Sequence, residues 1–149
     1  MSAAARLQAA IVRQLKGRAV LEGLAVFDMP PARAAPPYAV VEDAVLASWD
    51  AAGLLGREGR ISVVLHDGSE RPVRLRRLQE RIEDLIATLP ADLGGEGWRL
   101  ARLRLFRSKL LRGRGDRWSA TSEYEVRVYR ANGCTGEARW RSKREARSC

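Results

Sequence analysis

The spacing of hydrophobic and polar positions changes along the chain from a period near four to a period of two, which predicts helices and strands in a mixed order. In residues 3–16, Leu7, Ile11 and Leu15 recur every four residues, so this segment is predicted to be a helix that ends at Gly17. The first 18 residues also hold four basic residues and no acidic one, as organellar transit peptides do. The regular apolar spacing favours a core-packing helix over a transit peptide.

A second helix is predicted between Ser69 and Pro90, where apolar residues again recur at helical spacing. Its apolar positions are Leu75, Leu78, Ile82, Leu85, Ile86 and Leu89. Ser69 is expected to cap the free N–H groups of the first turn, and Pro72 lies in that turn, where its missing N–H does no harm. Pro90 and the glycines after it end the helix.

Four segments have the composition or the alternation of β-strands. They are residues 38–43, 61–67, 98–108 and 118–130. Residues 18–37, which contain four prolines, are predicted to be mostly irregular. Gly53, Gly56 and Gly59 are spaced like the glycines of a phosphate-binding loop, but such a loop requires a helix after it and here a strand follows. These glycines are therefore predicted to lie in a flexible connection.

The order of these elements is α-β-β-α-β-β, which predicts an α+β fold. We expect an antiparallel sheet of about four strands with two helices packed on one face. Residues 1–130 are predicted to form this domain. Residues 131–149 lose the apolar pattern and are predicted to form a basic, flexible C-terminal extension with one aromatic residue, Trp140.

The last two strands are predicted to form a hairpin that is joined by residues 109–117. For their apolar residues to share one face, odd-numbered residues of the first strand must lie opposite even-numbered residues of the second. A register of this kind places Arg104 opposite Glu123 and Arg102 opposite Glu125. Two arginines would then have partners of opposite charge on the sheet.

Charge is distributed unevenly along the chain. The formal net charge is +9, of which residues 1–97 contribute −1, residues 98–130 contribute +7 and residues 131–149 contribute +3. The basic residues predicted to lack a partner surround the hairpin loop. They are Arg107, Lys109, Arg112, Arg114 and Arg117, with only Asp116 against them. This excess indicates a polyanionic or acidic partner, and we expect these five residues to face an interface or DNA.

The side chains on which enzymes depend are scarce. His66 is the single histidine, and its place at a strand end is more typical of a solvated residue than of a general base. Cys134 and Cys149 form no CxxC pair and have no neighbouring histidine, so neither a zinc site nor another metal or cofactor site is expected. No apolar run is long enough to cross a bilayer. The sequence favours a non-enzymatic protein that does not span a membrane.

Several ordered features together resemble the tail-completion, or tail-terminator, family of long-tailed bacteriophages and gene transfer agents. They are an opening helix, a proline-rich loop that enters "PPYAVVED", the strand and helix of "ISVVLHDGSERPVRLRRLQERIEDLIATL", and the hairpin "WRLARLRLFRSKLLRGRGDRWSATSEYEVRVYR". The resemblance covers about residues 3–130. The hairpin is its most specific part.

The resemblance implies a structural subunit of a ring, typically a hexamer, at the head-proximal end of the tail tube. Such a ring contacts other copies of itself, the major tail tube protein and a head completion or connector protein, while DNA passes through its channel. The implied location is the head–tail junction of a particle assembled in the bacterial cytoplasm. The family offers no catalytic residues to carry over.

Two other hypotheses remain open. The same basic hairpin and extension could form a non-specific nucleic-acid-binding module, since neutralising phosphates needs only clustered positive charge. Arg114, Gly115 and Asp116 match an adhesion tripeptide, but the chain shows no secretion signal, and the two glycines around Arg114 indicate a turn.

Overall fold

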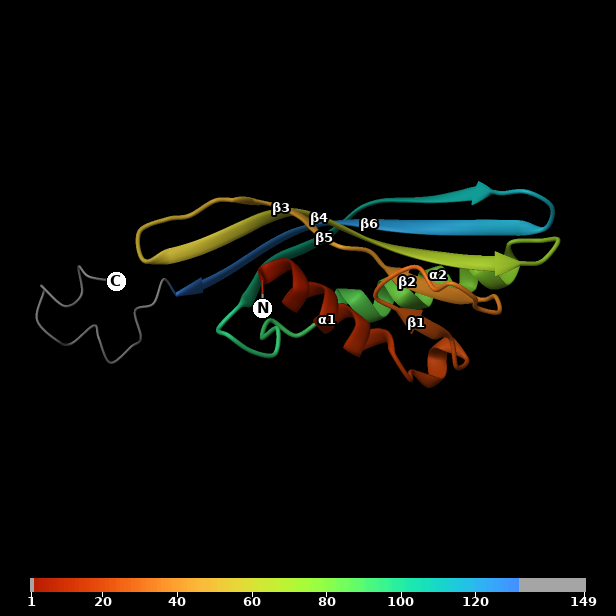
Figure 1. Ribbon diagram of the computed structural model, residues 1–149, viewed down its shortest axis with the longest axis horizontal. Helices are drawn as coiled ribbons and strands as arrows, with labels where there is room; N and C mark the ends of the chain where they lie inside the picture. Colours follow the sequence, from red (N-terminus) through yellow and green to blue (C-terminus); the bar gives the residue numbers. More distant parts are fainter. Residues whose placement is uncertain (1, 132–149) are drawn as a thin grey trace, which may run out of the picture.

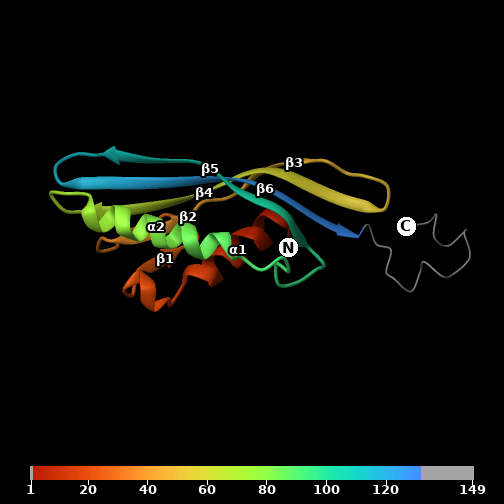
Figure 2. The same cartoon turned by 180° about the vertical axis from the view of Figure 1, so that it is seen from behind.

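The computed structural model describes residues 2–131, which form one long sheet with both helices on the same face (Figures 1 and 2). The helices are α1 (Ala3–Leu15) and α2 (Val73–Ala87), and a short 3-10 turn spans Ala19–Leu21. The strands are β1 (Ala25–Phe27), β2 (Tyr38–Val41), β3 (Val45–Ser48), β4 (Leu54–Gly68), β5 (Arg99–Arg112) and β6 (Arg117–Ala131). The predicted α+β class, with two helices on one face, is confirmed.

The sheet differs from the prediction in strand number and in direction. Its order is β1-β2-β4-β6-β5, and β3 pairs with the first part of β4, so there are six strands where about four were expected. The β1–β2 pair is parallel, which makes the sheet mixed. β1 was missed because three residues are too few to show a period of two, and the prolines that follow it dominate the sequence signal.

The glycine-containing segment before residue 61 is a β-hairpin: Gly53 lies in its turn, but Gly56 and Gly59 lie within β4, so the prediction of a flexible connection was wrong for these two. β4 begins at Leu54, and β3 pairs with it from Val45↔Arg60 to Ser48↔Arg57. Within β4, the indole of Trp49 lies against Gly56, and the main chain of Val45 lies against Gly59. These glycines serve close packing inside a strand, where any side chain would displace the neighbour.

Helix α1 begins where predicted, ends one residue before its predicted end, and buries its predicted face. The Ser2 hydroxyl accepts a hydrogen bond from the Ala5 N–H (Oγ to N, 3.1 Å) and so caps the first turn. Leu7, Ile11 and Leu15 are completely buried. The regular apolar spacing was therefore sufficient to place this helix on the core.

The predicted apolar residues of helix α2 lie on the core, with Leu85 and Leu89 only partly buried, but its N-terminus is built differently. Leu75, Leu78, Ile82 and Ile86 are buried. Pro72 holds the N-cap position, and the Ser69 hydroxyl donates to the Arg71 carbonyl (Oγ to O, 2.6 Å), so the expected cap by Ser69 was wrong. The competing bond inside the preceding loop takes the hydroxyl away from the helix.

The core lies between the helices and the centre of the sheet. Alternate residues of β4 and β6 point into it, among them Ile61, Leu65, Tyr124 and Val128. In the part of the chain described here, neither helix has the length and apolar character needed to cross a membrane. Residues 132–149, which contain Cys134, Trp140 and Cys149, lie outside the described residues, so the flexible extension stays a prediction.

Candidate interaction surface

The closing hairpin extends to one end of the molecule, away from the end reached by the β3–β4 hairpin (Figure 1). Its strands continue through most of the predicted loop, so residues 109–117 were wrongly assigned to a loop and only Gly113–Asp116 form the turn. The Gly113 N–H donates to the Arg117 carbonyl (N to O, 2.7 Å), and Gly115 has a φ of 62°. As predicted, the Arg114–Asp116 tripeptide lies in a turn that depends on glycine.

The predicted strand register was wrong by two residues. Arg104 lies opposite Glu125, and Arg102 lies opposite Arg127. Two irregularities, at Leu100/Arg102 and Leu105/Arg107, each place an extra residue in β5. Odd-numbered residues of β5 therefore lie opposite even-numbered residues of β6 only between the two bulges, as expected there, because each bulge reverses the alternation.

The sheet face away from the helices, here called the outer face, carries a network of ion pairs across β4, β6 and β5. Arg104 pairs with Glu125, and Arg107 pairs with Glu123 (Nε to Oε1, 3.3 Å), although Arg107 was predicted to lack a partner. Arg102 was predicted to have one, yet it makes no ion pair within residues 2–131. The bulges cause this exchange of roles, since they move Arg107 alongside Glu123.

Aromatic rings on the outer face are covered by arginines. The guanidinium of Arg60 lies 3.7 Å from the ring centroid of Phe106, and that of Arg127 lies 4.9 Å from the ring of Trp49. Arg127 also pairs with Glu58 (Nη2 to Oε2, 2.7 Å). These cation–π contacts occupy the ring faces on which an unstacked base would otherwise lie.

Strand β5 is an open edge of the sheet with an unusual composition. It pairs only with β6, and its 14 residues include six basic side chains and no acidic one. Leu105, Phe106 and Leu111 are 41%, 40% and 51% exposed, which is high for large apolar side chains. We call β5, with these residues, the basic edge. A long, partly apolar edge of this kind is a template for association with another chain.

The predicted partnerless residues other than Arg107 cluster at the hairpin end of this edge. Lys109 and Arg112 lie in β5, Arg114 lies in the turn and Arg117 begins β6. All four are exposed, and none makes an ion pair with another described residue. That these residues face a protein interface or DNA stays a prediction.

The opposite side of the sheet, formed by β1, β2 and β3, carries acidic residues that the sequence analysis missed. Asp28 follows β1, and Glu42 and Asp43 lie between β2 and β3; all three are exposed. Met29 and Val45 are exposed beside them, at 67% and 79%. We call this side the acidic edge. The available signal was the composition of residues 22–50, which hold five acidic residues and one basic residue.

A buried ion pair holds α2 under the sheet. Asp67, at the end of β4, is nearly inaccessible, and it accepts hydrogen bonds from Arg74 (Oδ2 to Nε, 3.0 Å) and from the Gly68 N–H (Oδ1 to N, 2.7 Å). The Arg74 guanidinium holds the pKa of Asp67 below its ordinary value. Farther along α2, the buried Ser122 hydroxyl donates to Glu83 (Oγ to Oε2, 2.7 Å). These contacts position the helix against β4 and β6.

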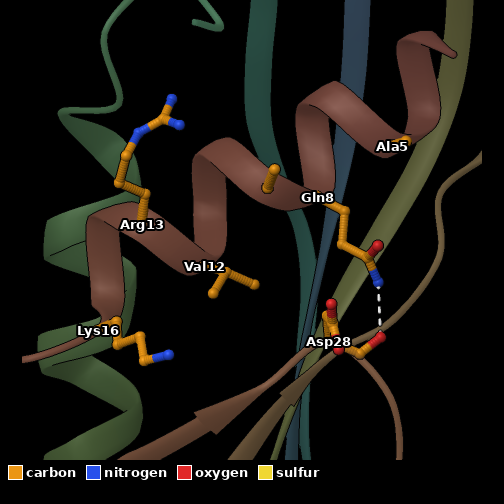
Figure 3. Close-up of a pocket in the computed structure, with 7 residues that line it drawn as sticks. Ala5, Gln8, Val12, Arg13, Lys16 and Asp28 are labelled. Atoms are coloured by element: carbon orange, nitrogen blue, oxygen red, sulfur yellow. Dashed lines mark hydrogen bonds between the residues drawn. The ribbon is translucent and has the colours of Figure 1, made fainter. Parts of the chain in front are cut away.

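A shallow hollow of about 500 Å³ lies along α1 beside the acidic edge (Figure 3). Ala5, Ala9 and Val12 line it, and Lys16 lies at its rim. The Gln8 amide donates to the main-chain carbonyl of Asp28 (Nε2 to O, 2.8 Å), which ties α1 to the end of β1. The hollow is predominantly apolar and brings no reactive groups together.

His66 lies near the end of β4, as predicted, but it is partly buried and not fully solvated. Its ring stacks on Tyr38, with centroids 4.9 Å apart, and burial lowers its pKa. No group of three or more potential metal ligands occurs among the described residues. The features that stand out in this structure are the two unlike edges of the sheet.

The fold and its edges define a class of small sheet-and-helix subunits suited to assembly with neighbours. The family model described as "Tail completion protein gp17" matches residues 5–129, and the chain belongs to this family. It is thus a structural protein of a phage-like particle, and the resemblance noted in the sequence is confirmed.

A solved structure gives a similar fold. A chain of the structure titled "Virion of native gene transfer agent (GTA) particle" is 26% identical, with a TM-score of 0.73, and the match covers 86% of this chain and 98% of that one. No curated protein matches the chain.

Proposed function

We propose that this protein assembles into a closed ring, a hexamer, that ends the tail tube and joins it to head completion or connector proteins. The observation that carries the proposal is the pair of open, unlike sheet edges. A ring buries both edges of every copy, whereas a free subunit leaves the outer side of β5 unpaired along its whole length. Membership of the tail-completion family supports this role at the head–tail junction.

The remaining surfaces suit different partners within the particle. DNA must slide through the channel of such a ring, and a surface that gripped phosphates would oppose that movement. We therefore propose that Lys109, Arg112, Arg114 and Arg117 face protein, either the tail tube or a neighbouring subunit. The proposal also places assembly in the bacterial cytoplasm, before the particle is released.

The mass of the purified protein tests the ring. Six copies of a 16.6 kDa chain give about 100 kDa, and we expect native mass spectrometry and light scattering to find this species, with a ring visible by negative-stain electron microscopy. Addition of purified tail tube protein should place the ring at the end of the tube. A monomer that persists at high concentration and in the presence of the tube protein would contradict the proposal.

A non-specific nucleic-acid-binding module is the second candidate, and the acid-free β5 strand is the observation that favours it. Binding through phosphate contacts would fall steeply with salt, by about 1,000-fold or more between 50 and 200 mM if six phosphates are neutralised. Because arginines cover Phe106 and Trp49, no preference for single strands is expected. Titration of the protein with duplex DNA at these two salt concentrations tests this function. An absence of binding at 50 mM salt would exclude the nucleic-acid-binding module.

A further inference from the structure

We infer that the ring is built by head-to-tail contact, with the basic edge of one copy lying against the acidic edge of the next. The inference rests on the proposed function and names the surfaces that would form the ring. The partner that covers each edge is, at every contact, another copy of this chain.

Strand order places the two edges where a head-to-tail contact requires them. The basic edge, β5, is the last strand on one side of the sheet, and β1 and β3 are the open strands on the other side. β5 runs parallel to β4, because both are antiparallel to β6, and β1 and β3 run opposite to β4. If the sheet continued into a neighbour with the same orientation, β5 would therefore meet antiparallel strands, the commoner pairing.

Unpaired charge on the two edges is complementary. On β5, Arg102 and Lys109 are exposed, and on the other edge Glu42 and Asp43 are exposed; none of the four makes an ion pair within residues 2–131. Contact between two basic edges, or between two acidic edges, would bring like charges together, which is unfavourable. The charge pattern thus opposes a two-fold dimer and favours a repeating contact between unlike surfaces, the kind of contact from which rings are built.

Both edges also offer apolar surface for the contact to bury. Leu105, Phe106 and Leu111 are exposed on the basic edge, and Met29 and Val45 are exposed on the acidic edge. The apolar hollow along α1 adjoins the acidic edge at Asp28, as Figure 3 shows. Apolar burial would supply affinity, and the charges would select which edge meets which.

Charge reversal on each edge tests the pairing. The basic-edge variant is Arg102→Glu with Lys109→Glu, and the acidic-edge variant is Glu42→Lys with Asp43→Lys. In each variant alone, the changed residues would face charges of their own sign on the neighbouring copy, so we expect its self-association to weaken by at least about 100-fold. Mixed in equal amounts, the two variants should co-assemble, because each basic-edge variant then meets an acidic-edge variant on both sides. An alternating ring with three copies of each is expected, and native mass spectrometry would resolve it.

Matched controls carry the same charge changes away from both edges. They are Arg71→Glu with Arg76→Glu, before and within α2, and Glu80→Lys with Asp84→Lys on the same helix; all four residues are exposed. The controls should assemble as the wild type does.

The possible outcomes distinguish failure of this inference from failure of the proposed function. If either edge variant still forms the wild-type ring on its own, the inference is overturned and the proposed ring is retained. Edge variants that fail to assemble alone and also fail when mixed would overturn the inference too. A wild type that never associates would overturn the ring and the inference together.

Cross-linking of the wild type gives a measurement that does not depend on variant folding. Carbodiimide couples a lysine amine to a carboxylate in direct contact with it. An amide between Lys109 and Glu42 or Asp43 in the assembled ring supports the contact, since these residues lie on opposite edges of one copy. If Lys109 in the assembled ring couples only to carboxylates other than Glu42 and Asp43, the proposed contact between the two edges is overturned.

Discussion

Replacing Arg74 by methionine is expected to destabilise the protein by about 3 kcal/mol, because the substitution leaves the carboxylate of Asp67 buried without its guanidinium. The Asp67 side chain is 1% exposed, whereas that of Arg74 is 43% exposed. The arginine could therefore be solvated without its partner, but the aspartate could not. Urea unfolding at pH 7 measures the loss of free energy of unfolding.

The pH dependence distinguishes a buried charge from a simple loss of packing. In the wild type, the lowered pKa of Asp67 contributes stability above about pH 4, and this contribution is lost as the pH falls through the folded-state pKa. In Arg74→Met, burial without a cation should raise the pKa of Asp67. Protonation of Asp67 then removes the free-energy cost of burying an unpaired carboxylate. We expect the difference from the wild type to shrink between pH 7 and pH 4; a difference that stays constant would contradict the electrostatic explanation.

An exposed ion pair supplies the control for this experiment. Arg127 and Glu58 form a contact of similar length on the outer face, with side chains 44% and 42% exposed. Glu58→Ala should cost no more than about 1 kcal/mol, because solvent screens the pair. Adding Asp67→Asn to Arg74→Met should recover part of the lost stability, since the double variant no longer buries a charge.

Replacing Gly59 by alanine is expected to destabilise the protein by about 2 kcal/mol and to release β3 from the sheet. A β-carbon at this position would overlap the carbonyl oxygen of Val45, which belongs to the main chain and cannot move without moving the strand. Urea unfolding measures the stability, and hydrogen exchange of the β3 amides shows whether the strand separates. Because β3 adjoins Glu42 and Asp43, assembly should weaken as well.

Gly68, in the same strand, is the matched control. A β-carbon there would lie 3.5 Å from Cγ of Pro36, an ordinary van der Waals contact, and its φ is not in the left-handed region. Gly68→Ala should change the stability by less than about 0.5 kcal/mol. Equal effects at the two glycines would show that the close approach of Val45 to Gly59 does not explain the loss of stability.

Local patterns predicted the elements whose signals are long and regular. The spacing of Leu7, Ile11 and Leu15, and that of the apolar residues after Leu75, located both helices and their buried faces. The extended, branched segments located β2, the second half of β4 and the closing hairpin. These signals succeed because a periodic apolar face must be buried somewhere, whatever lies opposite to it.

Predictions that depended on alignment between segments were less accurate. The charge pairs of Arg102 and Arg104 were displaced because bulges in β5 insert residues without changing the apolar composition. β3 and the first part of β4 were hidden by glycines that signal a turn in sequence and allow close packing in space. Neither error could be corrected from neighbouring residues alone.

The sequence by itself determined the fold class, both helices, the family resemblance and the location of the excess positive charge. These are properties of single segments and of composition. The tertiary structure decided which arginines have partners, that β5 is an open edge, and that Asp28, Glu42 and Asp43 lie on the edge opposite to it. Strand order and register bring together residues that are far apart in the chain, so a surface with two unlike edges exists only after the sheet has formed.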